Sequence, residues 1–227
     1  MLCQEMLFSP PPWLQPSIAA RTKFVDEEVV AAIAAGLRQV VILGAGYDDR
    51  ALRFRTPGVR FFELDHPATQ EDKARLLRAV SAGEGALTLA EIDFRTDDVG
   101  VVLDRAGHDA GQPTVFVCEG LLIYLNRDTC HRLLAGIAAR AQPGSVLAAS
   151  IAIHADGFDS DEVVAAANLR RRTGDAEPWR TILPAAEHLE LVELAGWRIT
   201  GVEESPVPVA DVTHGRRSLL VTAAVVA

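Results

Sequence analysis

A glycine turn follows a short apolar run in the first quarter of the chain, and its residue types could bind a ligand. The run Val40-Val41-Ile42-Leu43 leads directly into Gly44-Ala45-Gly46. Such an apolar run is typical of a strand buried on both faces, as at the centre of a parallel sheet. Glycines tolerate positive φ and let a ligand approach the backbone, while the first amides of a following helix point toward it. The pattern predicts a nucleotide-type binding turn at Gly44, Ala45 and Gly46, with a purely structural turn as the alternative.

Two acidic residues limit the kind of ligand that this turn could hold. A dinucleotide fingerprint has a third glycine where this chain has Asp49, which follows Asp48. Two carboxylates at this point would repel a diphosphate. The charges therefore favour a nucleoside that carries an amine or a sulfonium group, as S-adenosylmethionine does.

Three later apolar stretches end in a carboxylate, at Asp65, Asp93 and Glu119. In an open α/β sheet, ligands bind at the carboxyl ends of the strands. Asp65 stands about 20 residues after the glycine turn, where an acidic residue bonds the ribose hydroxyls in doubly wound folds. Glu63 lies in the same window, and Asp65 could instead serve only to start a helix before Pro67. We favour the ribose role for Asp65.

The pair Asp93-Phe94 suits an adenine ring. The carboxylate can accept a hydrogen bond from the exocyclic amine, and the apolar side chain can cover the ring. Asp93 is also placed to cap a helix predicted over residues 96–106, and the two roles are compatible.

Apolar periodicity and turn residues predict a doubly wound α/β fold with a seven-stranded, mostly parallel sheet. The predicted strands are 39–43, 59–65, 86–93, 114–120, 146–153, 197–203 and 218–226. Helices are predicted between them, among them 48–54 capped by Asp48, 67–82, 126–140, 161–172 and 183–195. The link between the last two strands contains Pro206 and Pro208 and is too short for a crossover helix, so the last strand should be antiparallel.

We expect a single domain over residues 1–227. Residues 1–36 would form an N-terminal arm and a cap helix, because the prolines of Ser9–Pro16 exclude regular helix there. The polar, irregular stretch 154–184 would form a helical lid over the site. Trp13, Phe158 and Trp179 would line an acceptor pocket beneath it.

Bulk composition excludes several classes of protein. The formal net charge is −9 over 227 residues, so we expect no nucleic-acid partner, because such partners require a basic face. We find no apolar segment of the ~18 residues that a membrane span needs, and from the residues at the N-terminus we expect no secretion leader. The three cysteines lack metal-ligand spacing, so we expect a reducing, cytoplasmic location and no metal. Oligomeric state stays open.

Four stretches together resemble the leucine carboxyl methyltransferase superfamily of class I S-adenosylmethionine-dependent methyltransferases. They are Ala20-Arg21-Thr22 with Asp26, the stretch 43–50, the stretch 62–67 and the stretch 119–125. The resemblance covers Ala20 to about Leu125. The family usually has Ser or Thr at the position of Asp49 and a longer helical N-terminus, so the acceptor pocket here should be more open.

The resemblance implies residue roles. Arg21 would meet the carboxylate of the cofactor's methionine moiety, Glu119 would lie by its amino group, and Tyr124 would help to hold an acceptor carboxylate. Gly44 to Gly46, Asp65, Asp93 and Phe94 would hold the rest of S-adenosylmethionine. The structural alternatives are that Arg21 only caps its own helix and that Tyr124 only packs in the core.

The implied reaction is methyl transfer to an oxygen, and we expect a carboxylate of a small molecule, as in secondary metabolism, or of a peptide end. A carboxylate is already ionised at neutral pH and needs no base. A hydroxyl acceptor would need one, and His154 is then the candidate. A non-catalytic S-adenosylmethionine-binding protein and a nicotinamide-dependent dehydrogenase are the other classes considered. The missing third glycine and the lack of a Tyr-x-x-x-Lys pair count against the dehydrogenase.

Overall fold

The computed structural model describes residues 15–79, 87–170, 177–205 and 216–226. Its strands are β1 (Gln39–Leu43), β2 (Arg60–Asp65), β3 (Leu87–Glu91), β4 (Thr114–Cys118), β5 (Val146–His154), β6 (Leu183–Pro184), β7 (Trp197–Glu204) and β8 (Arg217–Val225). Its helices are α1 (Gln15–Ala34), α2 (Arg50–Arg53), α3 (Pro67–Ala79), α4 (Val99–Ala106), the 3-10 helix η1 (Leu122–Tyr124), α5 (Arg127–Ala138), α6 (Ser160–Arg170) and α7 (Ala185–Leu194).

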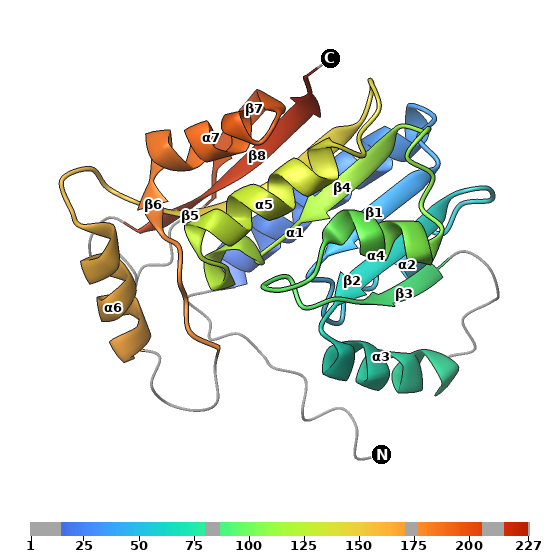
Figure 1. The fold of residues 1–227 in the computed structure, drawn as a ribbon, viewed down its shortest axis with the longest axis horizontal. Helices are drawn as coiled ribbons and strands as arrows, with labels where there is room; N and C mark the ends of the chain where they lie inside the picture. The colour runs from blue at the N-terminus through green and yellow to red at the C-terminus, as the bar shows by residue number, and fades with distance from the viewer. Residues whose placement is uncertain (1–14, 80–86, 171–176, 206–215, 227) are drawn as a thin grey trace.

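The strands form one sheet in the order β3-β2-β1-β4-β5-β8-β7, with β6 pairing to β5 (Figure 1). β1 lies between β2 and β4 and is parallel to both, so that Val41 is in register with Phe62 and Phe116. β8 is antiparallel to β5 and to β7. The prediction of a doubly wound, mostly parallel α/β sheet with an antiparallel last strand is confirmed.

Helices cover both faces of this sheet. In Figure 1, α4, α5 and α7 lie in front of the sheet and α1 lies behind it. Val41 and Leu43 of β1 pack into the core on the side of α4, α5 and α7, whereas Val40 and Ile42 pack with the apolar side chains of α1. All of β1 is buried, as a central parallel strand requires. Packing on both faces thus fixes β1, and with it the position at which the glycine turn follows Leu43.

Proline explains two of the element boundaries that differ from the sequence expectation. α1 begins at Gln15 and holds Pro16 in its first turn, where proline is tolerated because the first amides of a helix have no partner within it. The rest of the predicted arm lies outside the described residues. The predicted helix 183–195 begins at Ala185, and Leu183 is extended and pairs with Ile153 of β5. Proline at the next position disfavours helical backbone at Leu183.

The predicted lid region, 154–184, contains α6 and β6. Val163 and Ala167 of α6 pack with Ile182 and with the half-buried Trp179, in a cluster apart from the two main cores. Trp179 lines neither of the two pockets described below, and its place in an acceptor pocket stays a prediction. Residues 171–176 of this region lie outside the described part of the chain.

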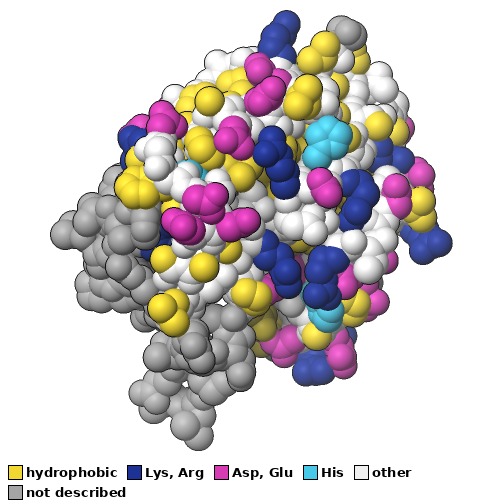
Figure 2. All heavy atoms as spheres, turned by 60° about the vertical axis from the view of Figure 1, so that its left-hand side comes forward, with side chains coloured by type: hydrophobic (Ala, Val, Ile, Leu, Met, Phe, Trp, Pro, Cys, Tyr) yellow, Lys and Arg dark blue, Asp and Glu magenta, His cyan; other side chains and the backbone are white. Residues whose placement is uncertain are grey.

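No helix in the described ranges is long and apolar enough to cross a bilayer. Figure 2 shows one face of the molecule, on which Lys and Arg side chains are interspersed with Asp and Glu. The described residues on that face do not form a continuous basic surface. That the chain has no nucleic-acid partner stays a prediction.

A buried ion pair supports the glycine turn from the side of α3. Glu63 of β2 has no exposed surface and contacts Lys73 of α3. Lys73 Nζ also donates a hydrogen bond of 2.7 Å to the carbonyl oxygen of Asp48. Burial raises the pKa of Glu63 to about 7, against the opposing effect of Lys73. Because Glu63 is fully buried, it is not available to a ligand, and of the two acids of β2 only Asp65 can meet one.

The raised pKa of Glu63 predicts a pH-dependent stability. Between about pH 4.5 and pH 7 the folded protein holds a proton that the unfolded chain releases, so this group's contribution to stability is lost as the pH rises. Glu63→Gln has no such group and should not lose this contribution. The difference in unfolding free energy, variant minus parent, should therefore be about 2 kcal/mol larger at pH 8 than at pH 5. Urea titrations at the two pH values measure it.

Glu27→Gln removes an exposed glutamate that pairs with Lys23 and is the matched control. A difference between Glu63→Gln and the parent that stays constant with pH would show that Glu63 has an ordinary pKa.

Candidate functional site

Two pockets meet at Gly44, at the carboxyl ends of β1, β2 and β4. Their volumes are about 260 Å³ and about 240 Å³. The first, here the arginine pocket, is lined by Arg21, Thr22, Ile42, Leu43, Gly44, Ala45, Tyr47, Asp48, Asp49, Arg50, Arg53 and Glu119. The second, here the aromatic pocket, is lined by Gly44, Asp65, His66, Ile92, Asp93, Phe94, Arg95, Gly120, Leu121, Tyr124, Leu125 and Glu177. Of the nine residues predicted for the site, eight line one pocket or both, and Gly46 lines neither.

The glycine turn is tied to the end of β2. The amides of Gly44 and Ala45 donate to the carbonyl oxygen of Leu64 at 2.9 and 3.1 Å, and the amide of Gly46 donates to Asp65 Oδ2 at 2.6 Å. Gly44 and Gly46 have φ values of 66° and 49°, which glycine adopts without strain. Gly46 therefore lies just outside the pockets but positions the carboxylate that lines one of them.

The glycines also leave room for close approach. A Cβ on Gly44 would lie 3.0 Å from the side chain of Leu121, whereas a Cβ on Gly46 would meet nothing within 4 Å. A side chain at Gly44 would therefore crowd Leu121 in the loop after β4, whereas the backbone at Gly46 is open to a neighbour. The amides around an open turn can meet a ligand directly.

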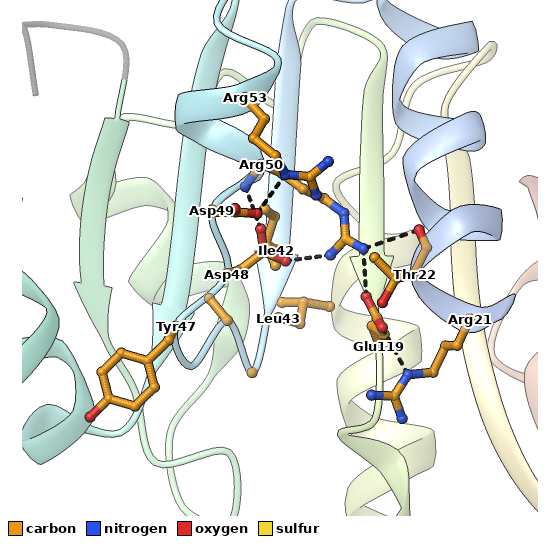
Figure 3. A pocket seen from close by; sticks show the side chains of 12 residues that line it. Arg21, Thr22, Ile42, Leu43, Tyr47, Asp48, Asp49, Arg50, Arg53 and Glu119 are labelled. Atoms are coloured by element: carbon orange, nitrogen blue, oxygen red, sulfur yellow. Dashed lines mark hydrogen bonds and ion pairs between the residues drawn. The ribbon is translucent and has the colours of Figure 1, made fainter. Parts of the chain in front are cut away.

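Glu119 joins the two arginines of the arginine pocket (Figure 3). Its Oε1 accepts from Arg21 Nε and its Oε2 lies near Arg50 Nη2, both at 2.8 Å. Arg21 therefore reaches from α1 across to the end of β4 and does not cap its own helix. The guanidinium of Arg21 also lies over the backbone of Gly120, where a Cβ would come within 3.2 Å of Nη1.

Arg50 lines the arginine pocket and was not predicted as a site residue. It is only 3% exposed and contacts the carboxylates of Asp26, Asp48 and Glu119. Asp48 was expected to cap α2, but the residue before α2 is Asp49, whose side chain makes no capping bond. Asp48 instead accepts from the Arg50 amide at 2.7 Å and pairs with its guanidinium. An arginine directly after two acids is the only sequence signal for this network.

Asp93 and Phe94 lie in the aromatic pocket with Asp65. Both oxygens of the Asp93 carboxylate accept from Arg95, at 2.9 and 2.7 Å. These bonds lower the pKa of Asp93 to about 2, so this carboxylate is ionised at neutral pH. The alternative that Asp93 caps the next helix is wrong, because α4 begins at Val99 and its cap is Asp98.

Tyr124 lines the aromatic pocket at the end of η1, and is therefore not confined to the core. The preceding residue, Ile123, accepts a backbone hydrogen bond of 2.7 Å from the amide of Arg180, so the lid region is attached directly beside Tyr124. Phe158, expected in the acceptor pocket, is 47% exposed and lines neither pocket. Trp13 lies outside the described residues.

His154, the candidate base for a hydroxyl acceptor, is the last residue of β5 and is 1% exposed. Its Nδ1 lies 2.8 Å from the carbonyl oxygen of Ala155 and its Nε2 lies 2.8 Å from Ser160 Oγ. Both ring nitrogens have partners, and His154 lines neither pocket. Among the described residues, no cluster of His, Cys, Asp and Glu could hold a metal ion.

Two solved structures with a similar arrangement of strands and helices are named as methyltransferases. A crystal structure from Thermobifida fusca named as a methyltransferase superposes with a TM-score of 0.69 at 20% identity, over 95% of this chain and 84% of that one. Magnesium protoporphyrin IX methyltransferase from Synechocystis, with S-adenosylhomocysteine bound, gives a TM-score of 0.58 at 13% identity, over 96% and 89% of the two chains. The fold is therefore the Rossmann-like fold of S-adenosylmethionine-dependent methyltransferases.

The chain belongs to the leucine carboxyl methyltransferase family, whose model matches residues 7–138. A Streptomyces coelicolor protein named as an S-adenosyl-L-methionine-dependent methyltransferase is 49% identical over 133 residues, which are 57% of this chain and 46% of that protein. A Parafrankia protein with the same kind of name is 35% identical over 192 residues, which are 84% of this chain and 60% of that protein. The chain thus spans about half to three fifths of the length of these relatives.

The Asp93–Arg95 contact predicts a measurable shift. Arg95→Gln removes the hydrogen bonds that lower the pKa of Asp93, so this pKa should rise from about 2 toward the ordinary aspartate value of about 3.9. Carboxyl-carbon NMR of the protein, titrated from pH 7 downward, measures it. Arg75→Gln, on the exposed face of α3, is the control and should leave Asp93 unchanged; an unmoved pKa in Arg95→Gln would refute the contact.

Proposed function

We propose that this chain is an S-adenosylmethionine-dependent O-methyltransferase that methylates a carboxylate. One observation carries the proposal: the two pockets share Gly44, with the Arg21–Glu119 pair in one and Asp65, Asp93 and Phe94 in the other. A ligand lying across Gly44 would meet both sets of residues. Family membership supports the reaction class.

The residues of both pockets fit this cofactor. Its amino-acid end is a zwitterion, for which Arg21 offers a fork of donors and Glu119 an acceptor. Asp65 offers carboxylate oxygens to a ribose diol, and Asp93 and Phe94 offer an acceptor and an apolar surface to adenine. A diphosphate fits poorly, because each arginine of the arginine pocket is already paired with a carboxylate that borders it: Arg21 with Glu119, Arg50 with Asp48 and Arg53 with Asp49. This charge distribution disfavours a nicotinamide-dependent dehydrogenase.

When bound, S-adenosylmethionine supplies an electrophilic methyl group on its sulfonium. The chain's own residues would bind and orient the reactants and exclude water. Tyr124 offers a hydroxyl donor to the acceptor from the wall of the aromatic pocket. An ionised carboxylate acceptor has no proton to remove, and the full set of partners around His154 supports an acceptor that needs no base.

The acceptor would be a small-molecule carboxylate, as in natural-product metabolism, or the end of a peptide, in the cytoplasm. The chain spans only part of its relatives' length, so the names of these relatives do not identify its acceptor. A screen of carboxylic acids with the full chain would identify it. Ligand binding without turnover on any acid would favour the non-catalytic alternative.

Calorimetric titration with S-adenosylhomocysteine tests the cofactor. We expect binding by the parent and roughly 10- to 100-fold weaker binding by Asp65→Asn, because hydrogen bonds to a charged group contribute about 1.5–3 kcal/mol. Asp109→Asn, at the opposite edge of the sheet beside Gln39, is the control and should bind as the parent does. Absence of heat and of a thermal shift for the parent would contradict the cofactor assignment.

The pH dependence of turnover tests the acceptor class. For a carboxylate acceptor, kcat/KM should be nearly constant from about pH 6 to pH 9, since the nucleophile is ionised throughout. Tyr124→Phe should raise KM for the acceptor about tenfold through loss of one hydrogen bond to a charged group, with little change in cofactor affinity. A rate that climbs with pH through a single ionisation would indicate a hydroxyl acceptor and a base.

A further inference from the structure

The guanidinium of Arg50 is buried where three elements meet. Its Nε donates to Asp26 Oδ1 of α1 at 2.7 Å, its Nη1 contacts Asp48, two residues after the glycine turn, and its Nη2 lies 2.8 Å from Glu119 Oε2 at the end of β4. Nη2 also lies 3.4 Å from the carbonyl oxygen of Thr22. All three nitrogens of the guanidinium are therefore engaged, and Figure 3 shows the contacts with Asp48, Glu119 and Thr22.

Arg50 balances acids that would otherwise repel one another. Asp48 and Glu119 have side chains that are 9% and 13% exposed, so solvent screens their charges little. Burial lowers the pKa of Arg50, but the neighbouring carboxylates outweigh this effect and raise it. The permanently charged guanidinium of Arg50 thus allows the carboxylates of Asp48 and Glu119 to lie close together beside the pocket.

The two arginines on Glu119 differ in their surroundings. The Arg21 side chain is 33% exposed and is described with one ion-pair partner, Glu119. The Arg50 side chain is 4% exposed and is held by three carboxylates. If Arg21 exchanges its partner, one partly exposed contact breaks. If Arg50 moved, its contacts with Asp26 of α1, with Asp48 after the glycine turn and with Glu119 at the end of β4 would all break.

We propose that Arg50 is a positioning residue that keeps Glu119 in place while Arg21 releases it and turns to the carboxylate of the bound methionine moiety. The inference rests on the proposed function. Glu119 then stays directed at the ligand's ammonium group, and the ligand's carboxylate replaces Glu119 as the partner of Arg21. A lysine at position 50 could not do this, because a single ammonium cannot hold three carboxylates in a fixed fork geometry.

Paired ligands separate this role from a general structural one. S-adenosylhomocysteine has the amino-acid end, and 5′-methylthioadenosine shares its nucleoside but lacks that end. In Arg50→Lys, calorimetry should show affinity for S-adenosylhomocysteine reduced roughly 10- to 100-fold and affinity for 5′-methylthioadenosine changed less than about twofold. Glu119→Gln should show the same selective loss. Arg140→Lys, which alters a half-buried arginine paired with Asp104, should change neither.

The outcomes are distinct. Unchanged binding of both ligands, or equal loss of both, in Arg50→Lys would overturn the positioning role. A parent protein that binds neither ligand would instead overturn the proposed function.

A measurement on the unmodified protein covers the case in which Arg50→Lys does not fold. In ¹⁵N NMR of arginine side chains, saturation with S-adenosylhomocysteine should shift the Arg21 Nε–H signal and leave that of Arg50 protected from exchange with solvent. Loss of the Arg50 signal, or an Arg21 signal that does not respond, would contradict the proposal.

Discussion

The carboxylate of Glu119, held between Arg21 and Arg50, is the contact on which the rest of the site depends. It joins α1, the start of α2 and the end of β4, three separate segments of the sequence. Such pairing among partly buried groups stabilises an arrangement only if each charge keeps its partner. The network also leaves one half-exposed arginine beside the pocket, which can meet an anionic group.

The parallel sheet explains why this site lies at one edge. Because β1, β2 and β4 run in the same direction and in register, their carboxyl ends and the side chains that follow them converge there. The carbonyl oxygen of Leu64 accepts from two amides of the glycine turn, so the turn and the end of β2 form one unit. Asp65 then faces the pocket, while Glu63, two residues earlier, is buried against Lys73 of α3.

Elements whose signal is local and periodic could be predicted from the sequence. The apolar runs of the central strands, the glycine turn and the acids at strand ends fall in this class. The two-residue β6 has no such signal, since only its pairing with β5 makes it a strand. The role of Arg50 depends on contacts with Asp26 and Glu119, 24 and 69 residues away. No periodic pattern encodes such contacts, and the packing of Trp179 against α6 was hidden for the same reason.

We expect one ligand to occupy both pockets, with Gly44 between its two ends. A crystal structure of the full chain with S-adenosylhomocysteine would show this. In it, adenine should lie against Phe94, ribose at Asp65 and the amino-acid end between Arg21 and Glu119, with Arg50 still in contact with Glu119. A ligand confined to one pocket, or bound away from Gly44, would contradict it.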